Sequence, residues 1–175
     1  MTDEIARKAS QVRVVILDVD GVLTDGTAYY MDDGSEMVAF NVQDGSGIKY
    51  LHRAGLQTAL ITGRSLAAVR YRVEVLGIDE LVQGAKRKMP AYEELKKEMR
   101  FSDEEACYAG DDLPDLPLIR RVGLGVAVKN SRPELKEEAD LVTEHAGGHG
   151  AVRELAEFIL KARGDWDGIM ERYLP

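Results

Sequence analysis

Short apolar runs recur along the chain, separated by segments in which apolar residues follow helical spacing. Residues 14–17 are a continuous apolar run of strand length, which is typical of a strand buried on both faces. Comparable runs follow at 56–61, 81–82, 107–109, 124–128 and 141–142. Helical patterns lie between them, at 48–51, 66–76, 92–99 and 152–160, and Ser65 and Gly77 are expected to cap and to end the second of these helices. This alternation predicts an α/β fold with a doubly wound, mostly parallel, Rossmann-like sheet, in which ligands bind at the carboxyl ends of the strands.

Two segments depart from this alternation. Residues 27–40 follow a strand, turn and strand pattern, with Asp33-Gly34 as the turn, and predict a β-hairpin that projects from the end of the first strand. The tail, residues 164–175, contains Trp166 and further apolar side chains, so we expect it to dock on a protein surface. The 175 residues contain neither a linker nor a repeat, and we expect one domain over 1–175.

Charge and composition exclude several classes of protein. The net charge is -8 and no basic stripe offsets it, which argues against nucleic acid as a partner. The single cysteine, Cys107, fits a reducing compartment. The N-terminus has no apolar signal core, and no apolar stretch approaches the ~20 residues that a membrane span needs. We therefore expect a cytoplasmic protein with no membrane partner.

Polar residues follow directly after the first two strong strands. Asp18 and Asp20 come after the first strand, where a simple turn would explain them if they stood alone. Thr62-Gly63-Arg64 comes after the strand over 56–61, and a hydroxyl with free backbone amides at such a place suits a phosphate oxygen. Because parallel strands end at one edge of the sheet, these groups are expected to meet there.

A cation and an acidic cluster follow the later strands. Lys88 is placed to neutralise a phosphate as a point charge, whereas we interpret Lys86 and Arg87 as a solvated charge run. The sequence 110–115 contains three carboxylates with no Lys or Arg among them. Such carboxylates repel one another and favour a hard cation, and Mg²⁺ takes oxygen ligands.

The ordered set Asp-x-Asp, Thr, Lys and Gly-Asp-Asp-x-x-Asp resembles the haloacid dehalogenase superfamily over essentially the whole chain. The resemblance implies that Asp18 is a nucleophile that forms an aspartyl-phosphate, and that Asp20 is the general acid and base. Thr62 and Lys88 would hold the phosphoryl oxygens. The implied Mg²⁺ ligands are Asp18, the backbone carbonyl of Asp20, and Asp111. Asp112 or Asp115 would support the metal or orient Lys88.

A longer match narrows the family. Residues 18–26, 40–45 and 147–154 resemble the 3-deoxy-D-manno-octulosonate 8-phosphate phosphatases, which act in the synthesis of lipopolysaccharide precursors. The spans between the motifs leave no room for a cap domain, and the resemblance implies a homotetramer in which neighbours help to close each site. The small anionic sugar-phosphate substrate would contact Asn41, Val42, Gln43, Asp44, Gly45, Lys49, Arg64, Arg72 and Lys88.

Other interpretations stay open. Gln43 and Lys49 stand where relatives often carry Arg, so phosphatases of nine-carbon keto-sugar acid 9-phosphates are rivals. A phosphoacceptor signalling domain also combines Asp, Thr and Lys, but it needs its acceptor on a middle strand rather than the first. A catalytically silent interaction module is a further alternative. The histidines are interpreted without chemistry: His52 as a solvated helix residue, and His145 and His149 as loop residues.

Overall fold

The computed structural model describes residues 3–174, so the first two residues and the last residue of the tail, Pro175, lie outside the described part. Six parallel strands form the central sheet in the order β5-β4-β1-β6-β7-β8. The chain winds from β1 outward to β5, returns to β6 and winds outward again, which confirms the doubly wound prediction. The strands are β1 (Val14–Leu17), β4 (Gln57–Ile61), β5 (Glu80–Val82), β6 (Ala106–Gly110), β7 (Leu124–Ala127) and β8 (Leu141–Val142).

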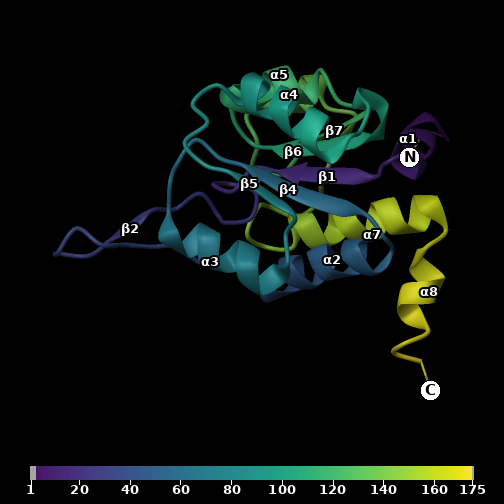
Figure 1. The fold of residues 1–175 in the computed structure, drawn as a ribbon, viewed down its shortest axis with the longest axis horizontal. Helices are drawn as coiled ribbons and strands as arrows, with labels where there is room; N and C mark the ends of the chain where they lie inside the picture. Colours follow the sequence, from purple (N-terminus) through teal and green to yellow (C-terminus); the bar gives the residue numbers. More distant parts are fainter. Residues whose placement is uncertain (1–2, 175) are drawn as a thin grey trace.

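Helices cover both faces of this sheet (Figure 1). One face carries α2 (Val42–Arg53), α3 (Ala67–Leu76) and α7 (Ala151–Arg163). The other carries α4 (Lys88–Met99), α5 (Leu116–Ile119) and α6 (Pro133–Glu138), with the short 3-10 turns η1 (Asp103–Glu105) and η2 (Leu113–Asp115). The terminal helices α1 (Asp3–Ser10) and α8 (Trp166–Met170) pack against α7. Among residues 3–174, no helix is both long and apolar enough to cross a membrane.

The central strand explains why two separate cores form. Side chains of a strand alternate between its faces, and β1 is buried along its whole length. Val15 and Leu17 join the core under α2 and α7, whereas Val14 and Ile16 join the core under α4. A continuous apolar run is therefore required here, because a polar residue on either face would be buried. The same geometry sends the next residue, Asp18, out of the sheet at its carboxyl edge.

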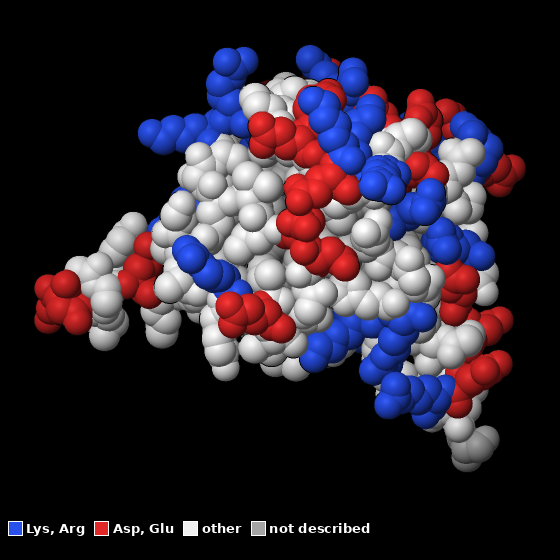
Figure 2. Space-filling view, viewed as in Figure 1, with Lys and Arg blue, Asp and Glu red and all other residues white. Residues whose placement is uncertain are grey.

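The predicted hairpin is present and projects away from the body (Figure 1). Its strands, β2 (Tyr29–Tyr30) and β3 (Glu36–Met37), are antiparallel and pair only with each other among the described strands. Both strands carry apolar side chains in water, and Tyr30 is 69% exposed. The projecting end carries acidic side chains, whereas basic and acidic groups are mixed over the rest of this face (Figure 2).

Two local expectations are changed by the structure, and a third is confirmed. Ser65 does not cap α3, because the N-cap residue is Leu66 and no side chain caps it; Gly77 does end the helix, in the left-handed region. His52 is not simply solvated: its Nε2 lies 2.6 Å from the Thr58 hydroxyl, and burial lowers its pKa. Thr58 in turn donates its amide to Asp79, so His52 belongs to a polar contact between α2 and the sheet.

The tail packs on α2 of its own chain. The Trp166 ring meets Tyr50 edge-on at 6.2 Å between centroids, Ile169 is buried, and Arg53 donates to the Tyr173 hydroxyl at 2.9 Å. In Figure 1, α8 lies at the end of the sheet opposite to the carboxyl ends of the strands. The described tail is therefore remote from the edge at which Asp18 emerges.

Candidate active site

A cavity of about 470 Å³ opens at the carboxyl ends of the strands, where the fold predicts ligand binding. The loops after β1, β4, β5 and β6 each contribute to its wall. The lining residues are Asp18, Asp20, Gly26, Gly63, Arg64, Ala85, Lys86, Lys88, Asp111, Asp112, Pro114 and Asp115. The four polar motifs, which are far apart in the sequence, are thus brought to one place.

Lys88 starts α4, and its side chain is 4% exposed at the base of this cavity. Its ammonium donates to Asp18 Oδ2 at 2.8 Å, to Asp115 Oδ1 at 2.5 Å and to the Tyr108 hydroxyl at 3.2 Å. A lysine ammonium has three N–H donors, so each of them has a partner. Lys88 is therefore held as a fixed cation beside Asp18.

Asp115 is fully buried, and its hydrogen bonds distinguish it from Asp112. Its Oδ1 accepts from Lys88 and from the Tyr108 hydroxyl, the latter at 2.6 Å. Its Oδ2 accepts from the backbone amides of Asp111 at 2.9 Å and of Asp112 at 3.2 Å. A carboxylate has about four lone-pair sites, and all are in use. Asp115 orients Lys88, whereas the exposed Asp112 carboxylate accepts the next backbone amide, at 2.8 Å.

Arg64 connects Asp20 to the projecting hairpin. One guanidinium nitrogen of Arg64 lies 3.0 Å from Asp20 Oδ1, and another forms an ion pair with Glu36 of β3. The Thr62 hydroxyl lies 3.5 Å from the other oxygen of Asp20 and accepts the Arg64 backbone amide at 3.2 Å. Arg64 and Thr62 therefore hold the Asp20 carboxylate from two sides. Asp18 has a different cationic partner, Lys88.

Burial and mutual repulsion change the acidity of the site carboxylates. Burial, followed by the charge of Asp115, raises the pKa of Asp18 to about 7, although Lys88 opposes the shift. Burial and the charges of Asp115 and Asp112 likewise raise the pKa of Asp111 to about 7. Burial alone would lower the pKa of Lys88, but Asp18 and Asp115 together raise it. One lysine thus does not balance the carboxylates near neutral pH, and a further cation is favoured.

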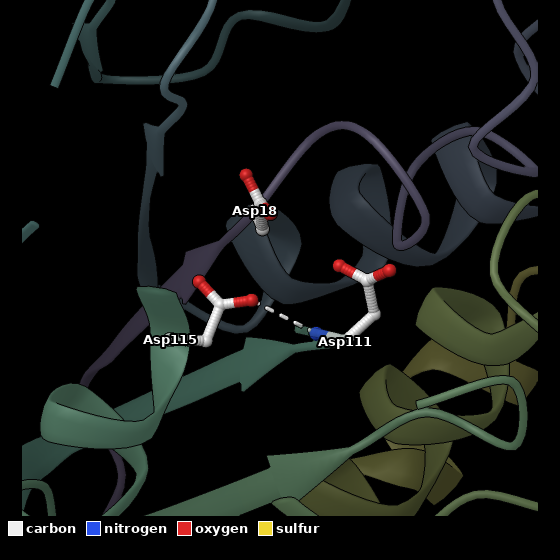
Figure 3. A group of neighbouring side chains, drawn as sticks. All are labelled: Asp18, Asp111 and Asp115. Carbon is white, nitrogen blue, oxygen red and sulfur yellow. Dashed lines mark hydrogen bonds between the residues drawn. The ribbon is translucent and has the colours of Figure 1, made fainter. Parts of the chain in front are cut away.

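The donor set fits magnesium. Ligand atoms of Asp18, Asp111 and Asp115 lie within 4.8 Å of one another (Figure 3), but the lone pairs of Asp115 are already occupied. Asp18 and Asp111 keep free lone pairs, and the Asp111 carboxylate lies against the loop after β1: a Cβ on Gly21, whose φ is +83°, would stand 2.1 Å from Asp111 Oδ2. Carboxylate oxygens and backbone carbonyl oxygens are the kind of ligand that Mg²⁺ prefers.

The raised pKa values predict how magnesium binding responds to pH. Below pH 7, protons occupy Asp18 and Asp111 and compete with the cation. We expect the affinity for Mg²⁺ to fall between pH 8 and pH 6 by about tenfold for each proton displaced. Calorimetric titration with MgCl₂ in two buffers of different ionisation enthalpy measures both the affinity and the number of protons released. An affinity that is independent of pH would contradict the prediction, and Asp111→Asn is the control that should bind Mg²⁺ weakly at both pH values.

A glycine-rich segment before α7 supports the loop after β1. The Gly147 amide donates to Asn130 Oδ1 at 2.6 Å, and the Asn130 amide group donates to the Gly21 carbonyl at 2.9 Å. A Cβ on Gly147 would lie 1.8 Å from that same carbonyl oxygen, so a larger residue does not fit. The loop that carries Asp20 is thereby fixed from behind.

Two comparisons with known proteins bear on this site. A model of the haloacid dehalogenase-like hydrolases matches residues 80–155. The 3-deoxy-D-manno-octulosonate 8-phosphate phosphatase KdsC of Escherichia coli strain K12 is 44% identical over 164 residues, 94% of this chain and 87% of that protein. The chain belongs to this phosphatase family. It is also similar to the KdsC protein of Yersinia pestis, at 42% identity over 96% of this chain and 90% of that protein.

Solved structures of octulosonate 8-phosphate phosphatases have the same fold. The Moraxella catarrhalis enzyme, crystallised in complex with a magnesium ion, a phosphate ion and KDO, matches with a TM-score of 0.97 at 40% identity, over 99% of this chain and 100% of that one. The Yersinia pestis enzyme matches with a TM-score of 0.94 at 42% identity, over 96% of this chain and 91% of that one. The parallel sheet and its flanking helices are thus those of the family.

The structure divides the substrate contacts that the family resemblance implies. Arg64 and Lys88 line the cavity, but four others line a separate hollow of about 110 Å³ between α2 and α3. Asn41 caps α2, and Gln43 lies exposed in its first turn. Within one chain, the residues of α2 and of the small hollow do not line the cavity that contains Asp18 and Lys88. The four in the hollow are Val42, Gly45, Lys49 and Arg72.

Asp44 has a structural position that the sequence does not reveal. It is 1% exposed, and its carboxylate accepts the backbone amides of Gly150 at 3.3 Å and Arg153 at 2.9 Å. Gly150 is the N-cap residue of α7 and Arg153 lies in the first turn, and the N-cap residue itself offers no side-chain cap. Asp44 therefore joins α2 to α7 and supplies an anion where the helix dipole favours one.

We expect Asp44→Ala to reduce stability rather than catalysis. Loss of the buried acceptor leaves helix amides unpaired and should cost about 2 kcal/mol, or about 4–8 °C in melting temperature for a chain of this size. Thermal melting is compared with Michaelis kinetics well below the transition. A KM that rises tenfold at unchanged stability would instead place Asp44 at the substrate. Gln43→Ala, an exposed neighbour, is the control for the melting measurement.

Several residues of the site are missed by sequence reasoning. Lys86, interpreted above as solvated, lines the cavity although it is exposed. Glu36, Tyr108 and Asn130 reach the site through contacts described above and belong to no motif. The position of Tyr108 three residues before Asp111 was available as a clue, since it places Tyr108 in the strand that carries the acidic loop.

Proposed function

We propose that this protein is a magnesium-dependent phosphatase that hydrolyses 3-deoxy-D-manno-octulosonate 8-phosphate to the free sugar acid and phosphate. The observation that carries the proposal is Asp18, held at a strand end with Lys88 on one oxygen and Asp111 beside it. The relatives named for this reaction are more than 40% identical over most of their length. The Moraxella catarrhalis relative binds magnesium, phosphate and KDO in its crystal structure.

The first half of the reaction follows from the positions of the carboxylates. An Asp18 oxygen attacks the phosphorus, and the bond from phosphorus to the sugar oxygen breaks. Asp20, fixed by Arg64 and Thr62, gives a proton to the leaving oxygen. Lys88 holds positive charge beside the transferring group, where preorganised charge is most effective. The product of this half is an aspartyl-phosphate on Asp18 and the free sugar acid.

The second half returns the enzyme to its starting state. Asp20, now ionised, takes a proton from water, whose oxygen attacks the phosphorus and releases Asp18. Asp18, Asp111 and the backbone carbonyl of Asp20 would hold magnesium. Its chemistry when bound is charge neutralisation on the phosphoryl oxygens. Asp115 contributes by keeping Lys88 oriented through both halves.

The basic groups on the cavity wall support an acidic sugar as the substrate. Lys86 lines the wall beyond Lys88 as an exposed cation that can attract a carboxylate, and Arg64 lines it with its guanidinium paired to Asp20 and Glu36. An ester with a second anionic group is therefore favoured over a neutral sugar phosphate. Phosphatases of nine-carbon keto-sugar acid 9-phosphates share this requirement and are the alternative.

Phosphate release from a panel of esters in the presence of MgCl₂ tests this proposal. The panel contains the octulosonate 8-phosphate, the nine-carbon keto-sugar acid 9-phosphates, glucose 6-phosphate and a chromogenic aryl phosphate. The expected result is the highest kcat/KM for the octulosonate ester. A higher value for a nine-carbon ester would keep the mechanism and change the substrate. No release from any ester would contradict the proposal and favour a catalytically silent interaction module.

A homotetramer is proposed on two grounds. The hairpin exposes Tyr29, Tyr30, Met31 and Met37, which is apolar surface suited to an interface. The described tail lies at the opposite end of the sheet from the site, so any site that it helps to close belongs to another subunit. Light scattering of the wild type and of Tyr30→Lys should give a tetramer and a smaller species, respectively. A fully active wild-type monomer would exclude the tetramer.

One domain over 1–175 and a cytoplasmic location complete the proposal. The buried free thiol of Cys107 favours a reducing compartment. Fractionation of the source cells with the activity as the marker tests the location.

A further inference from the structure

Tyr108 lies below the site, on the central part of the sheet. It is fully buried in β6, on the face covered by α4, and its hydroxyl is the only polar atom of its side chain. This hydroxyl donates to Asp115 Oδ1 at 2.6 Å and accepts from Lys88 Nζ at 3.2 Å. A phenol has one O–H donor and can accept as well. The Tyr108 hydroxyl therefore uses both its donor and its acceptor capacity, on Asp115 and Lys88, two charged residues of the site.

The Tyr108 hydroxyl, the Lys88 ammonium and the Asp115 carboxylate are joined to one another by three hydrogen bonds. Lys88 donates to Asp115, Tyr108 donates to the same oxygen of Asp115, and Lys88 also donates to Tyr108. Burial, followed by the charges of Asp115 and Asp18, raises the pKa of Tyr108 well above its ordinary value, so the phenol stays a neutral donor. Two of the three ammonium donors are thereby directed into the protein, and the third is directed at Asp18.

Loss of this hydroxyl would change the direction of the ammonium rather than its presence. One N–H of Lys88 would have no partner in a buried environment, which is unfavourable. Rotation of the ammonium would then bring that donor to another acceptor, at the expense of the bond to Asp18. Because catalysis depends on charge placed correctly before the reaction, a small change of direction has a large effect.

We propose that Tyr108 is a positioning residue for this reaction, which directs the Lys88 ammonium at the nucleophile Asp18. The inference rests on the proposed function, because it assigns Lys88 a role beside the transferring phosphoryl group. It adds to that function a residue outside the four motifs. Tyr108 itself does not touch the substrate.

The kinetic test compares two buried tyrosines. Tyr108→Phe removes only the hydroxyl and should lower kcat by about 10- to 100-fold with KM within about twofold of wild type. Tyr92→Phe is the matched control, because Tyr92 is equally buried in the same core, but its hydroxyl donates to Asp103 at 2.7 Å, away from the cavity. Equal kcat values for Tyr108→Phe and wild type would overturn the inference.

A double-mutant cycle separates positioning from a general structural effect. If Tyr108 acts through Lys88, Tyr108→Phe should cause no further loss of kcat in a Lys88→Met background. A structural role would give the same factor in both backgrounds, and that result would also overturn the inference. The aryl phosphate at saturating concentration is the substrate for this cycle.

A spectroscopic measurement keeps the inference testable without turnover. In protein labelled with ¹⁵N-lysine, the three bonded N–H groups of Lys88 should give a slowly exchanging ammonium signal, assigned by its absence from Lys88→Met. The signal should persist in Tyr92→Phe and broaden by solvent exchange in Tyr108→Phe. Persistence in Tyr108→Phe overturns the inference. Failure of the proposed function is seen separately, as absence of phosphate release by the wild type.

Discussion

Asp18→Asn is expected to lower kcat by at least about 10⁴-fold on every ester, the scale of loss seen when an enzyme nucleophile is removed. An amide does not attack phosphorus as a carboxylate does, although it has nearly the same shape. Its oxygen can still accept the Val19 amide, which Asp18 Oδ1 accepts at 2.7 Å in the wild type. The loss is therefore chemical, and phosphate release with and without MgCl₂ measures it.

Asp18→Asn should leave the fold intact and stabilise the metal-free protein at pH 8. The ordinary pKa of the Asp18 carboxyl is 3.8 and its pKa in the folded wild type is about 7. The folded state therefore binds the proton more tightly than the unfolded state does. Wild-type stability therefore falls as pH rises from about 4 to 7, whereas a neutral asparagine is not affected. Melting in EDTA at pH 5 and pH 8 measures this difference.

The matched control for the nucleophile is Asp112→Asn. Asp112 lines the same cavity, but it is exposed and its carboxylate accepts backbone amides of η2, which an asparagine oxygen can also accept. We expect kcat within about threefold of wild type, because loss of one exposed charge is a small perturbation. If Asp18→Asn keeps a tenth of wild-type activity, Asp18 is not the nucleophile.

Lys88→Met should have the second largest effect, on both rate and stability. Without the ammonium, Asp18 and Asp115 are buried with no cation, and removal of one partner from a buried ion pair costs about 3 kcal/mol. This corresponds to a fall of about 6–12 °C in melting temperature in EDTA. The lost charge stabilisation should lower kcat by about 10³-fold. Calorimetry and steady-state kinetics provide the two measurements.

The pH dependence of this destabilisation has a definite sign. Lys88 lowers the pKa of Asp18 against the effect of burial, so its removal raises that pKa above about 7. At pH 6 a proton replaces the missing ammonium on Asp18, and at pH 8 it does not. The variant should therefore lose more stability at pH 8 than at pH 6. Lys86→Met, an exposed lysine in the same cavity, should melt like wild type at both pH values.

Much of the fold is predictable because buried parallel strands leave a strong mark on the sequence. The apolar runs at 14–17 and 141–142 coincide with β1 and β8 to the residue. β1 is buried on both faces, which excludes polar residues, so its apolar run ends where the strand ends. The positions of Asp18, Thr62, Lys88 and Asp111 follow from the same logic, since each comes just after a strand or at the start of the next helix.

The contacts of the site are less predictable, for reasons that are physical. Asp112 and Asp115 differ by three positions, and only the path of η2 decides which carboxylate turns back into the protein. Asp44 lies in the segment 40–45, on which the family resemblance was based, yet its buried contacts lie with the start of α7, more than 100 residues away in the sequence. Sequence patterns report burial and local geometry, whereas these contacts depend on how distant helices pack.

The position of β1 at the centre of the sheet has a consequence for synthesis of the chain. β1 pairs with β4 on one side and with β6, near residue 106, on the other. A ribosome adds about 5–20 residues per second, so the strand that carries the nucleophile waits on the order of ten seconds for its second neighbour. During this time its apolar edge is unpaired, which is the state that chaperones bind. Nascent chains halted before residue 106 should therefore be held by chaperones, whereas full-length chains, in which α7 covers the core, should fold on their own.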